Sequence, residues 1–397
     1  MSQLVVNALA AQTAPAAGKT KVYTKADGLI YSMSSDGIER TLTSPGTIPS
    51  NSILANYRNR LINGGFNINQ RGVSIVSSNL WAHNAYCMDR WYVQTETTSS
   101  ANVSAQQLLD PENIQTECVR LTQQDLIAKR MGLVQVIEGC NSRQLKGQAV
   151  TLSGRIRSSS SQAIRFAVLA NTSVEDVWTH NIINSWSSSN YTGGNFFTAA
   201  AGTPVGIGSI VPVSSIWTPF TLTCTLPANL KNIVVFVWTE STFAQTNTLD
   251  LGLVQLEPGA SATAYEYRHL GIEKLLANRY YWSSFPAGQQ PALNIASSKI
   301  SLCIPAIYGG GSYPGWGSPP IAVQQAFPTQ MRVVPTMSYY NSDSSAAGHA
   351  FSTFVGSAIS WQNQSVSANQ FSASYTTSST GSSSTLLNFH ATADSDI

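Results

Sequence analysis

The chain has 397 residues, of which 43% are hydrophobic, so it is long enough for two or three domains with buried cores. Charged residues make up only 11%, less than half of the roughly 25% usual in globular proteins. Serine, threonine, asparagine and glutamine must therefore supply most of the surface polarity. The net charge is +2, no cluster of lysine and arginine occurs, and neither residue follows Arg332. This composition argues against nucleic acid or an anionic membrane as partner, because phosphate binding needs clustered basic residues.

Cysteine and histidine show no pattern typical of a metal site or a disulfide framework. The chain has five of each, with no CxxC pair and no two histidines adjacent. We therefore expect no metal, no cofactor, and single thiols buried in a protein made in a reducing compartment. The N-terminus lacks a basic segment followed by an apolar run, and no apolar stretch reaches the roughly 18 residues of a membrane helix. Neither a signal peptide nor a membrane span is expected.

The N-terminal segment predicts an arm followed by a small β-meander. Residues 1–20 are rich in alanine, threonine and proline and are expected to be extended. Two Asp-Gly pairs, at Asp27 and Asp36, separate three short alternating runs, and Asp-Gly favours tight hairpin turns. Three short strands cannot bury a core of their own. We therefore expect residues 1–57 to form an arm and β-hairpin module that anchors the protein on another chain.

From residue 58 onward the sequence predicts an all-β protein. Residues 58–270 contain many runs of β-branched and aromatic residues between turn signals, a spacing typical of an antiparallel sandwich. Helical periodicity is limited to residues 125–136, where it is ambiguous, and to 271–282, where we expect a short linking helix. Residues 283–397 are rich in serine with spaced apolar residues. They predict a second β-sandwich that presents a nearly uncharged distal surface.

The most marked stretch opens the first predicted sandwich and has no spacing typical of catalysis. It begins with a turn at Asn63 and Gly64, which would let the chain enter the sheet. Phe66 and Ile68 lie two residues apart and, in a strand, would point to one face. We interpret the stretch as the device that closes the sandwich between its first and last strands.

The same stretch ends with Asp89, Arg90 and Trp91. Adjacent residues of a strand point to opposite faces, so Asp89 and Arg90 are not expected to pair with each other. Each buried charge needs a partner, which we expect to be a backbone group or an opposite charge elsewhere, with Glu266 or Arg268 in the predicted last strand as the candidate. Trp91 is expected to fill the core beside them.

Acidic residues are too thinly spread to predict glycoside hydrolysis, which needs two carboxylates flanking a sugar. Beyond residue 283 the acids are Asp343, Asp394 and Asp396, which we expect in a loop and in the C-terminal tail. A Gly-x-Ser-x-Gly motif and a phosphate-binding loop are missing as well. We therefore predict no catalytic residues and no enzyme activity.

Two loops combine aromatic rings with amides and hydroxyls. Aromatic rings can stack on the apolar faces of sugars, while amides and hydroxyls hydrogen-bond to sugar hydroxyls. The alternative is that the rings pack their own loop or a neighbouring chain. The glycan-binding candidates are Trp186, Asn190 and Tyr191 in the first loop, and Tyr308, Tyr313 and Trp316 in the second.

Several segments together resemble a domain of bacteriophage tail-fibre and virion-appendage proteins. The resemblance lies in the Asn-Gly-Gly-Phe turn, in a Gln-Arg-Gly turn at Gln70, and in a Tyr-x-x-Asp-Arg-Trp motif at Tyr86. It continues in "YEYRHLGIEKLLANRYYW" from Tyr265 and in "FPTQMRVVP" from Phe327. The stretch with the two Asp-Gly pairs is similar to a hairpin module near the N-terminus of many such appendages.

The resemblance implies a jelly-roll domain similar to a carbohydrate-binding module, a homotrimer, and a place on the exterior of a phage particle after synthesis in the bacterial cytoplasm. The expected function is that of a tail fibre or receptor-binding protein that attaches to host surface glycans with trimeric avidity. The expected partners are other copies of the chain, virion proteins bound through residues 1–57, and a host polysaccharide or glycan, without nucleic acid or membrane insertion. The alternative is a head fibre or a capsid-decorating cement protein whose N-terminal arm stabilises the head.

Overall fold

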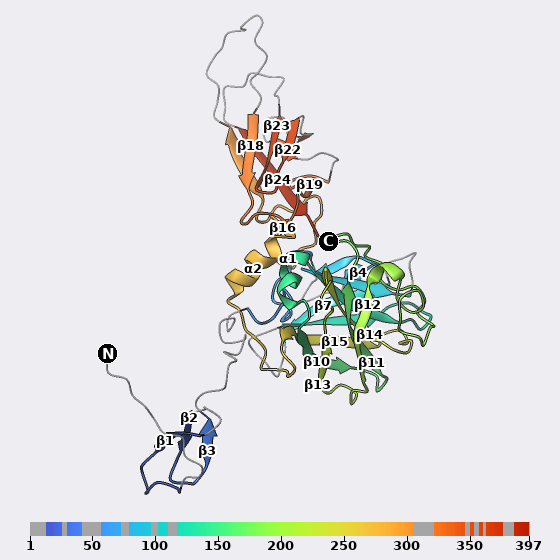
Figure 1. Ribbon diagram of the computed structural model, residues 1–397. Helices are drawn as coiled ribbons and strands as arrows, with labels where there is room; N and C mark the ends of the chain where they lie inside the picture. Colours follow the sequence, from blue (N-terminus) through green and yellow to red (C-terminus); the bar gives the residue numbers. More distant parts are fainter. Residues whose placement is uncertain are drawn as a thin grey trace, which may run out of the picture. The chain divides into compact units, whose positions relative to one another are not determined.

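The computed structural model shows a chain built almost entirely from antiparallel strands (Figure 1). It describes residues 13–25, 30–41, 57–72, 79–96, 102–109, 117–304, 321–345, 350–352, 357–359, 363–375 and 385–396. The chain divides into two compact units, Met1–Arg58 and Asn59–Ile397. The all-β prediction is confirmed.

The first unit contains the predicted meander. Its strands are β1 (Lys21–Thr24), β2 (Ile30–Met33) and β3 (Glu39–Thr41), which pair in the order β1-β2-β3. Tyr23 is buried and donates a hydrogen bond to Glu39, which also pairs with Lys25. These polar contacts link Glu39 in β3 to Tyr23 in β1 and to Lys25 just after it, although β1 and β3 do not pair directly.

The second unit begins with a sandwich of two six-stranded antiparallel sheets, which we call the large sandwich. One sheet has the order β13-β10-β15-β8-β7-β4. Its strands are β4 (Asn79–Trp81), β7 (Val103–Leu109), β8 (Glu117–Gln123), β10 (Ala149–Ser158), β13 (Thr218–Thr225) and β15 (Thr248–Pro258). The other sheet has the order β12-β11-β14-β9-β6-β5. Its strands are β5 (Tyr86–Met88), β6 (Trp91–Thr95), β9 (Met131–Ile137), β11 (Ile164–Asn171), β12 (Thr203–Ile210) and β14 (Asn232–Thr239).

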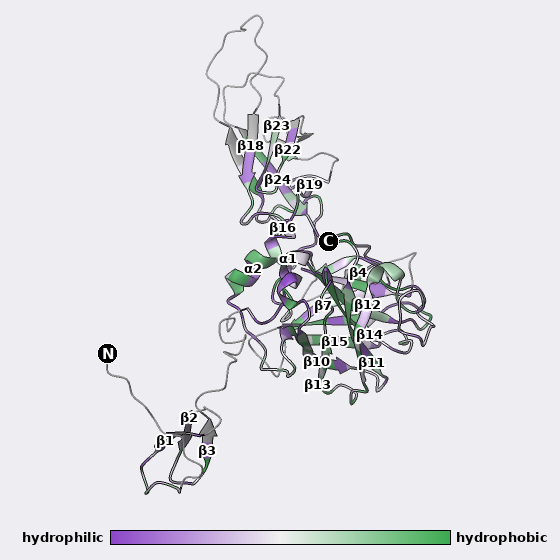
Figure 2. Cartoon of the chain, viewed as in Figure 1, coloured by the Kyte–Doolittle hydropathy of each residue, from purple (hydrophilic) through white to green (hydrophobic). Residues whose placement is uncertain are grey.

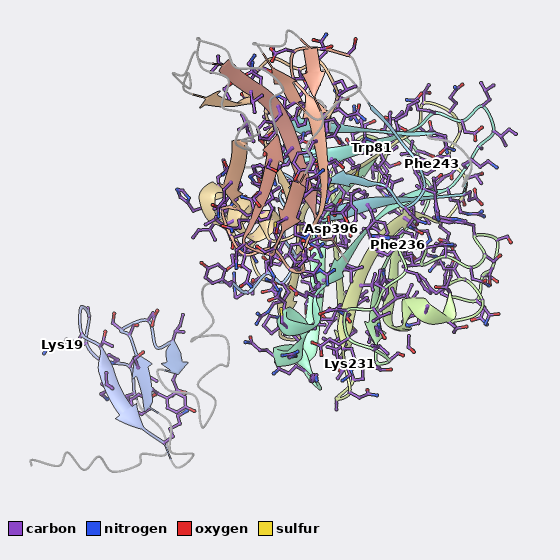
Figure 3. The ribbon with its side chains drawn as sticks, turned by 90° about the horizontal axis from the view of Figure 1, so that it is seen from above. Lys19, Trp81, Lys231, Phe236, Phe243 and Asp396 are labelled. Carbon is purple, nitrogen blue, oxygen red and sulfur yellow. The ribbon has the colours of Figure 1, made fainter. Side chains whose placement is uncertain are left out.

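Alternation of apolar and polar residues explains why these segments form sandwich strands. In β10, Leu152 and Ile156 point into the core between the sheets, while Arg155 and Arg157 point outward. β14 is different, because all of its residues are buried. A second apolar cluster covers the outer face of its sheet, and Phe236, labelled in Figure 3, lies in that cluster.

Helical structure in the described residues is limited to short segments. They are α1 (Gly139–Ser142), the 3-10 turns η1 (Arg143–Leu145) and η2 (Ala199–Ala201), and α2 (Leu270–Asn278). The predicted linking helix is thus present. Ala277 packs against the large sandwich, whereas Leu270 and Leu275 are exposed. Figure 2 shows apolar residues on α2 in green. The ambiguous residues 125–136 form no helix: they contain bends and then most of β9, which lacks alternation because both of its faces are buried.

The first part of the opening stretch (residues 61–93), up to Gly72, forms no strand but joins the last strand of the large sandwich. The N–H of Val254 donates to the carbonyl oxygen of Gly64 at 2.9 Å, and the N–H of Arg60 donates to Leu256 at 2.8 Å. Strand β15 has a bulge at this point, with Leu253 at a positive φ of 52°. A Cβ on Gly64 would overlap the carbonyl group of Val254, so this close approach needs glycine.

One detail of the predicted closure is wrong. Phe66 and Ile68 do not share a face, because Phe66 lies in the core between the sheets and Ile68 lies in the cluster on the outer face. The cause is the backbone: Asn63 and Phe66 have φ values of 58° and 54°, so the chain turns here instead of running straight. Phe66 packs 5.4 Å from Trp91, which is fully buried as predicted.

A smaller C-terminal sandwich follows within the same unit. Its strands are β16 (Tyr281–Ser283), β17 (Ile300–Ile304), β18 (Ile321–Ala326), β19 (Thr336–Asn341), β20 (Ala350–Ser352), β21 (Ser357–Ile359), β22 (Asn363–Val366), β23 (Gln370–Tyr375) and β24 (Thr385–Asp394). The long strand β24 is central: β16 and β17 pair with one edge, and β19 and β20 pair with the other. A second sheet, β18-β23-β22, packs on it through a core that includes Phe371 and Phe389.

Candidate functional site

Two turns of the opening stretch lie beside the C-terminal sandwich. Gln70 donates from its backbone N–H and from Nε2 to the carboxylate of Asp89, at 2.7 and 2.9 Å. Gln70 Nε2 also donates to the carbonyl oxygen of Tyr281 in β16 at 3.0 Å. Arg90 follows in a turn with φ of 70°. Asp89 and Arg90 are therefore turn residues, and the rule that adjacent strand residues point to opposite faces does not apply to them.

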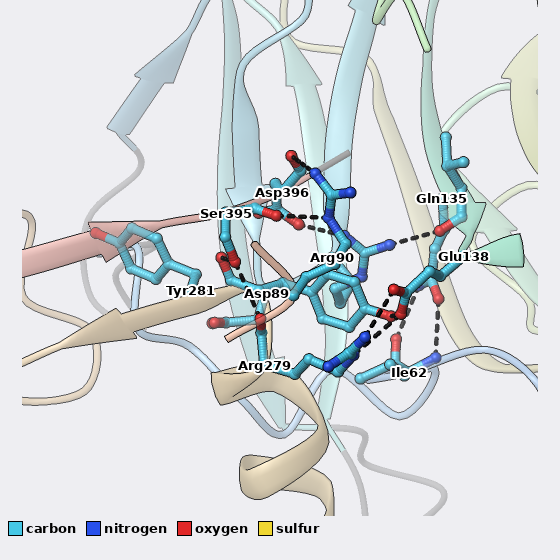
Figure 4. A network of polar contacts seen from close by, with 12 residues as sticks. Ile62, Asp89, Arg90, Gln135, Glu138, Arg279, Tyr281, Ser395 and Asp396 are labelled. Carbon is cyan, nitrogen blue, oxygen red and sulfur yellow. Dashed lines mark hydrogen bonds and ion pairs between the residues drawn. The ribbon is translucent and has the colours of Figure 1, made fainter. Parts of the chain in front are cut away.

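Arg71 and Arg90 both bind the carboxylate of Asp396 at the end of the chain (Figure 4). The three side chains are buried, with exposures of 8%, 2% and 4%. Arg90 also donates to the carbonyl oxygen of Val136 at 2.5 Å, and its guanidinium lies 3.7 Å from the ring centroid of Tyr280. This network joins the large sandwich to the C-terminal sandwich.

Backbone groups do contact Asp89 and Arg90, as expected, but the expected charged partners, Glu266 and Arg268, are wrong. Glu266 instead accepts a hydrogen bond from the N–H of Asn59, and Arg268 donates to the carbonyl oxygen of Asn59 and pairs with Glu273. Glu266 and Arg268 thus hold Asn59, which lies about 200 positions away in sequence, as the closure hypothesis requires. Asn59 comes just before the opening stretch, whereas Asp89 and Arg90 lie near its end.

A second ion pair, between buried Glu138 and half-buried Arg279, supports the same junction. Arg279, which follows α2, donates to Glu138 at 2.7 and 3.0 Å, and the hydroxyl of Tyr280 donates to Glu138 at 2.8 Å. Burial alone would raise the pKa of Glu138, but the hydrogen bonds from Arg279 and Tyr280 outweigh it and hold the pKa below its ordinary value. Ser395 donates to the carbonyl oxygen of Arg279 at 3.0 Å, which fixes the tail.

Burial dominates the electrostatics of Asp89. It raises the pKa of Asp89, although the charge of Arg71 and the two hydrogen bonds from Gln70 act in the opposite direction. Burial likewise raises the pKa of Tyr86 well above its ordinary value. The phenol of Tyr86 is therefore neutral over the whole physiological range of pH.

A cavity of about 570 Å³ lies at this junction, and we call it the junction cavity. Four aromatic rings line it, and they are those of Trp81, Tyr86, Tyr281 and Tyr340. Its polar lining residues are Arg71, Gln290, Thr336, Ser338, Thr392, Asp394 and Asp396. Trp81 and Asp396, both labelled in Figure 3, come from opposite ends of the unit's sequence and meet here only through the fold.

The rings of the junction cavity are held in fixed positions. The guanidinium of Arg71 lies 3.9 Å from the ring centroid of Tyr281 and 4.5 Å from that of Tyr86. Asp396 in turn holds Arg71, so the network sets the geometry of the wall. Asp394, with 45% of its side chain exposed, offers a carboxylate to solvent. Trp81 Nε1 is a buried donor with no hydrogen-bond partner among the residues that the structure describes.

The first predicted aromatic loop covers the outer face of the sheet that contains β14. Trp186 is half-buried and packs edge-on against Phe196 and Phe236, with ring centroids 5.9 and 6.2 Å apart. Tyr191 is also half-buried, lies 4.3 Å from the guanidinium of Arg165 and donates to Glu240. The loop aromatics thus pack largely on their own sheet, while the amide of Asn190 is exposed.

The first aromatic loop does not contribute to the junction cavity, but its approach segment adjoins it. His180 lies 5.5 Å from Tyr86, ring to ring, in an edge-on contact. The second predicted loop, with Tyr308, Tyr313 and Trp316, falls outside the described residues. Within the described residues no group of three histidines, cysteines or acids is placed to hold a metal ion. No helix of that part of the chain is long and apolar enough to cross a membrane.

Sequence reasoning missed the residues that form the junction cavity. Asp394 and Asp396 were expected in a loop or tail, but Asp394 ends β24 and Asp396 is buried between two arginines. The signal that pointed to this region was the clustering of Arg71, Asp89 and Arg90, buried charges for which the sequence offered no nearby partner.

Comparisons with known proteins add the following. No family model and no curated protein matches the chain. A solved structure of the enzymatically active domain of tailspike protein 4 from bacteriophage CBA120 is 12% identical, with a TM-score of 0.31, over 51% of this chain and 22% of that one. A putative sugar binding protein from Bacteroides thetaiotaomicron is 12% identical, with a TM-score of 0.32, over 51% of this chain and all of that one. A carbohydrate-binding module of family 4 is 14% identical, with a TM-score of 0.28, over 50% and 98%. At these low scores, the proposals below rest on the chain's own residues.

Proposed function

We propose that this chain is a glycan-binding structural protein of a phage particle and that the junction cavity binds the glycan. One observation carries the proposal: four aromatic rings face a group of hydroxyl, amide and carboxylate side chains in one preformed cavity. Sugars present apolar C–H faces and polar hydroxyls side by side, and such a wall can satisfy both. The cavity's volume lies within the usual range for small-ligand sites, about 300–1,000 Å³.

The fixed geometry of the wall supports binding without large rearrangement. Arg71 is held by Asp396 and in turn orients Tyr86 and Tyr281, so little side-chain entropy remains to be lost when a sugar binds. The exposed carboxylate of Asp394 would accept a hydrogen bond from a sugar hydroxyl. Trp186, Asn190 and Tyr191 form a second candidate contact surface for the same glycan.

The proposal is one of binding and not of hydrolysis. Glycoside hydrolysis needs one carboxylic acid that protonates the leaving group and a second carboxylate nearby. In the junction cavity the candidates are Asp394 and Asp396, and Asp396 is buried in ion pairs with two arginines. Arg71 binds Oδ2 of that carboxylate and Arg90 binds Oδ1, so both oxygens are engaged and the junction cavity does not offer the two free carboxyl groups that hydrolysis needs.

The proposed place on the particle is supported by the resemblance of the sequence to tail-fibre and appendage proteins and by the separate N-terminal unit. We propose attachment to other virion proteins through residues 1–57, assembly as a homotrimer, and exposure of the second unit on the exterior of the particle. The leading assignment is a tail fibre or receptor-binding protein. In the alternative assignment, the protein is a head fibre or cement protein. The N-terminal unit is then the functional element, and the second unit forms an outward-facing decoration of the capsid.

The experiment is a binding assay with immobilised lipopolysaccharide, capsular polysaccharide and peptidoglycan from a panel of bacteria. The variants are Trp81→Ala and Asp394→Asn, with Trp186→Ala for the loop and Tyr267→Ala as a control for an exposed aromatic outside the cavity. Trp81→Ala should weaken binding about tenfold or more, since a lost ring contact is worth roughly 1.5–3 kcal/mol. Equal losses for Trp81→Ala and Tyr267→Ala, or no binding to any glycan, would contradict the proposal.

A further inference from the structure

A row of charged side chains crosses the outer face of the sheet that contains β10, β15 and β8. Arg157 on β10 lies opposite Asp250 on β15, and Asp250 lies opposite Arg120 on β8. Arg157 Nε donates to Asp250 Oδ2 at 2.8 Å. Arg120 Nε and Nη2 donate to the two oxygens of the same carboxylate at 2.7 and 2.8 Å. We call the set formed by Arg120, Arg155, Arg157, Trp217 and Asp250 the arginine row.

Trp217, which directly precedes β13, packs beside the arginines of β10. The guanidinium groups of Arg155 and Arg157 each lie 4.8 Å from its ring centroid. The ring reaches Gly252 in β15, where it would lie 3.5 Å from a Cβ, an ordinary van der Waals distance. The buried ring and the buried carboxylate of Asp250 therefore hold the guanidinium groups from two sides.

Two guanidinium groups share one carboxylate in the arginine row. Arg120 and Arg157 both bind Asp250, and that carboxylate is only 1% exposed. Arg120 and Arg157 remain 31% and 19% exposed. Within the described part of the chain, Nη1 of Arg120 and both terminal nitrogens of Arg157 donate no hydrogen bond. Solvent-accessible donors of fixed orientation thus face outward from this sheet.

We propose that the arginine row is a binding site for an oxyanion, the carboxylate or the phosphate of an acidic polysaccharide. A guanidinium group offers paired N–H donors whose spacing fits both oxyanions, and such charge-assisted pairs are strong. If the row only stabilised the pairing of the strands, one arginine would be enough to neutralise Asp250. The carbohydrate part of this proposal rests on the proposed function, whereas the oxyanion part does not.

The test uses the full chain and three polymers of known chemistry. Polygalacturonate supplies carboxylates, wall teichoic acid supplies phosphates, and dextran is the neutral control. The wild-type protein should bind at least one of the acidic polymers, and the binding should weaken at high salt because exposed charges are screened. Binding of polygalacturonate alone identifies the carboxylate as the ligand, binding of teichoic acid alone identifies the phosphate, and binding of both shows that the row recognises either oxyanion.

Matched variants locate the site. Arg157→Gln should weaken binding of the acidic polymer about tenfold, because it removes the charge-assisted hydrogen bonds that this guanidinium would donate to the oxyanion. Arg143→Gln removes the same charge from an exposed arginine on η1, paired with Glu175, and should have little effect. Arg157→Lys keeps the charge but lacks the paired N–H donors of the guanidinium, so it should weaken binding less than Arg157→Gln does. If Arg157→Gln does not fold, a loss of affinity in Arg157→Lys tests the proposal instead.

Two results would overturn the proposal. One is that neither acidic polymer binds to the wild-type protein, and the other is that Arg143→Gln weakens binding as much as Arg157→Gln. The variant Trp81→Ala separates this site from the junction cavity. It should leave binding of the acidic polymer to the arginine row unchanged, even if the cavity proposal fails.

Discussion

The most informative perturbation is Asp396→Asn, which removes one negative charge and almost no volume. Arg71 and Arg90 are 8% and 2% exposed and both bind this carboxylate. After the substitution Arg90 loses its ion pair, and Arg71 keeps a contact of 3.4 Å with Asp394, which is 45% exposed. Removing one partner of a buried ion pair costs about 3–5 kcal/mol, because a buried charge is left uncompensated.

Urea unfolding followed by tryptophan fluorescence measures this loss. All nine tryptophans lie after Arg58, so the signal reports the second unit alone. The free energy of unfolding should fall by about 3–5 kcal/mol, out of the roughly 5–15 kcal/mol typical of a folded domain. The control Glu175→Gln breaks an exposed pair with Arg143 and should leave the unfolding midpoint almost unchanged. A loss below about 1 kcal/mol for Asp396→Asn, the value of a surface pair, would refute the buried network.

Three further predictions concern other parts of the second unit. The pKa of Glu138 lies below its ordinary value of 4.5, so the stabilisation that it provides with Arg279 is present above that value and is lost as the pH falls further. Unfolding midpoints measured in acid should show this decline, and Glu138→Gln should flatten it. Gly64→Ala should cost about 1–3 kcal/mol in urea unfolding, because its Cβ overlaps β15, and a smaller change would argue against the closure. Burial raises the pKa of Cys87 to about 12, so its thiol should react with an alkylating reagent only after unfolding, whereas exposed Cys140 should react first in the folded protein, as peptide mass mapping will reveal.

Local patterns were sufficient to predict much of the fold. The two Asp-Gly pairs of the meander and the alternation in β10 each act over a few residues, and the structure has strands at both places. Residues 125–136 show the limit of this reasoning. Leu126 is exposed at a bend, while β9 is buried on both faces and so carries no alternation that distinguishes it from a helix.

The candidate sites were largely beyond reach of the sequence, because their members come from distant segments. Asp396 lies some 300 positions from Arg90 in sequence, and nothing local to Arg90 indicates that a tail returns to it. The arginine row is similar: Arg120 and Asp250 are 130 positions apart and meet only because β8 and β15 pair. The absence of a basic cluster in the sequence was therefore no guide to the charge on the surface.

The opening stretch fastens more of the molecule than was predicted from its sequence. Its first half joins the last strand of the large sandwich through Gly64, in agreement with the closure hypothesis. Its second half, through Arg71 and Arg90, holds the C-terminal tail. The marked residue types of the stretch thus follow from two structural tasks, and the junction cavity lies where the second task is performed.

The most direct test of the central claim is to measure, by titration calorimetry, the affinity of the wild-type protein and of Trp81→Ala for the polysaccharide that binds best in the panel. Both proteins must show the same cooperative unfolding, so that the comparison reports binding alone. We predict that the variant binds about tenfold or more weakly, as expected for the loss of a ring from the junction cavity. Equal affinities would contradict glycan binding in the cavity.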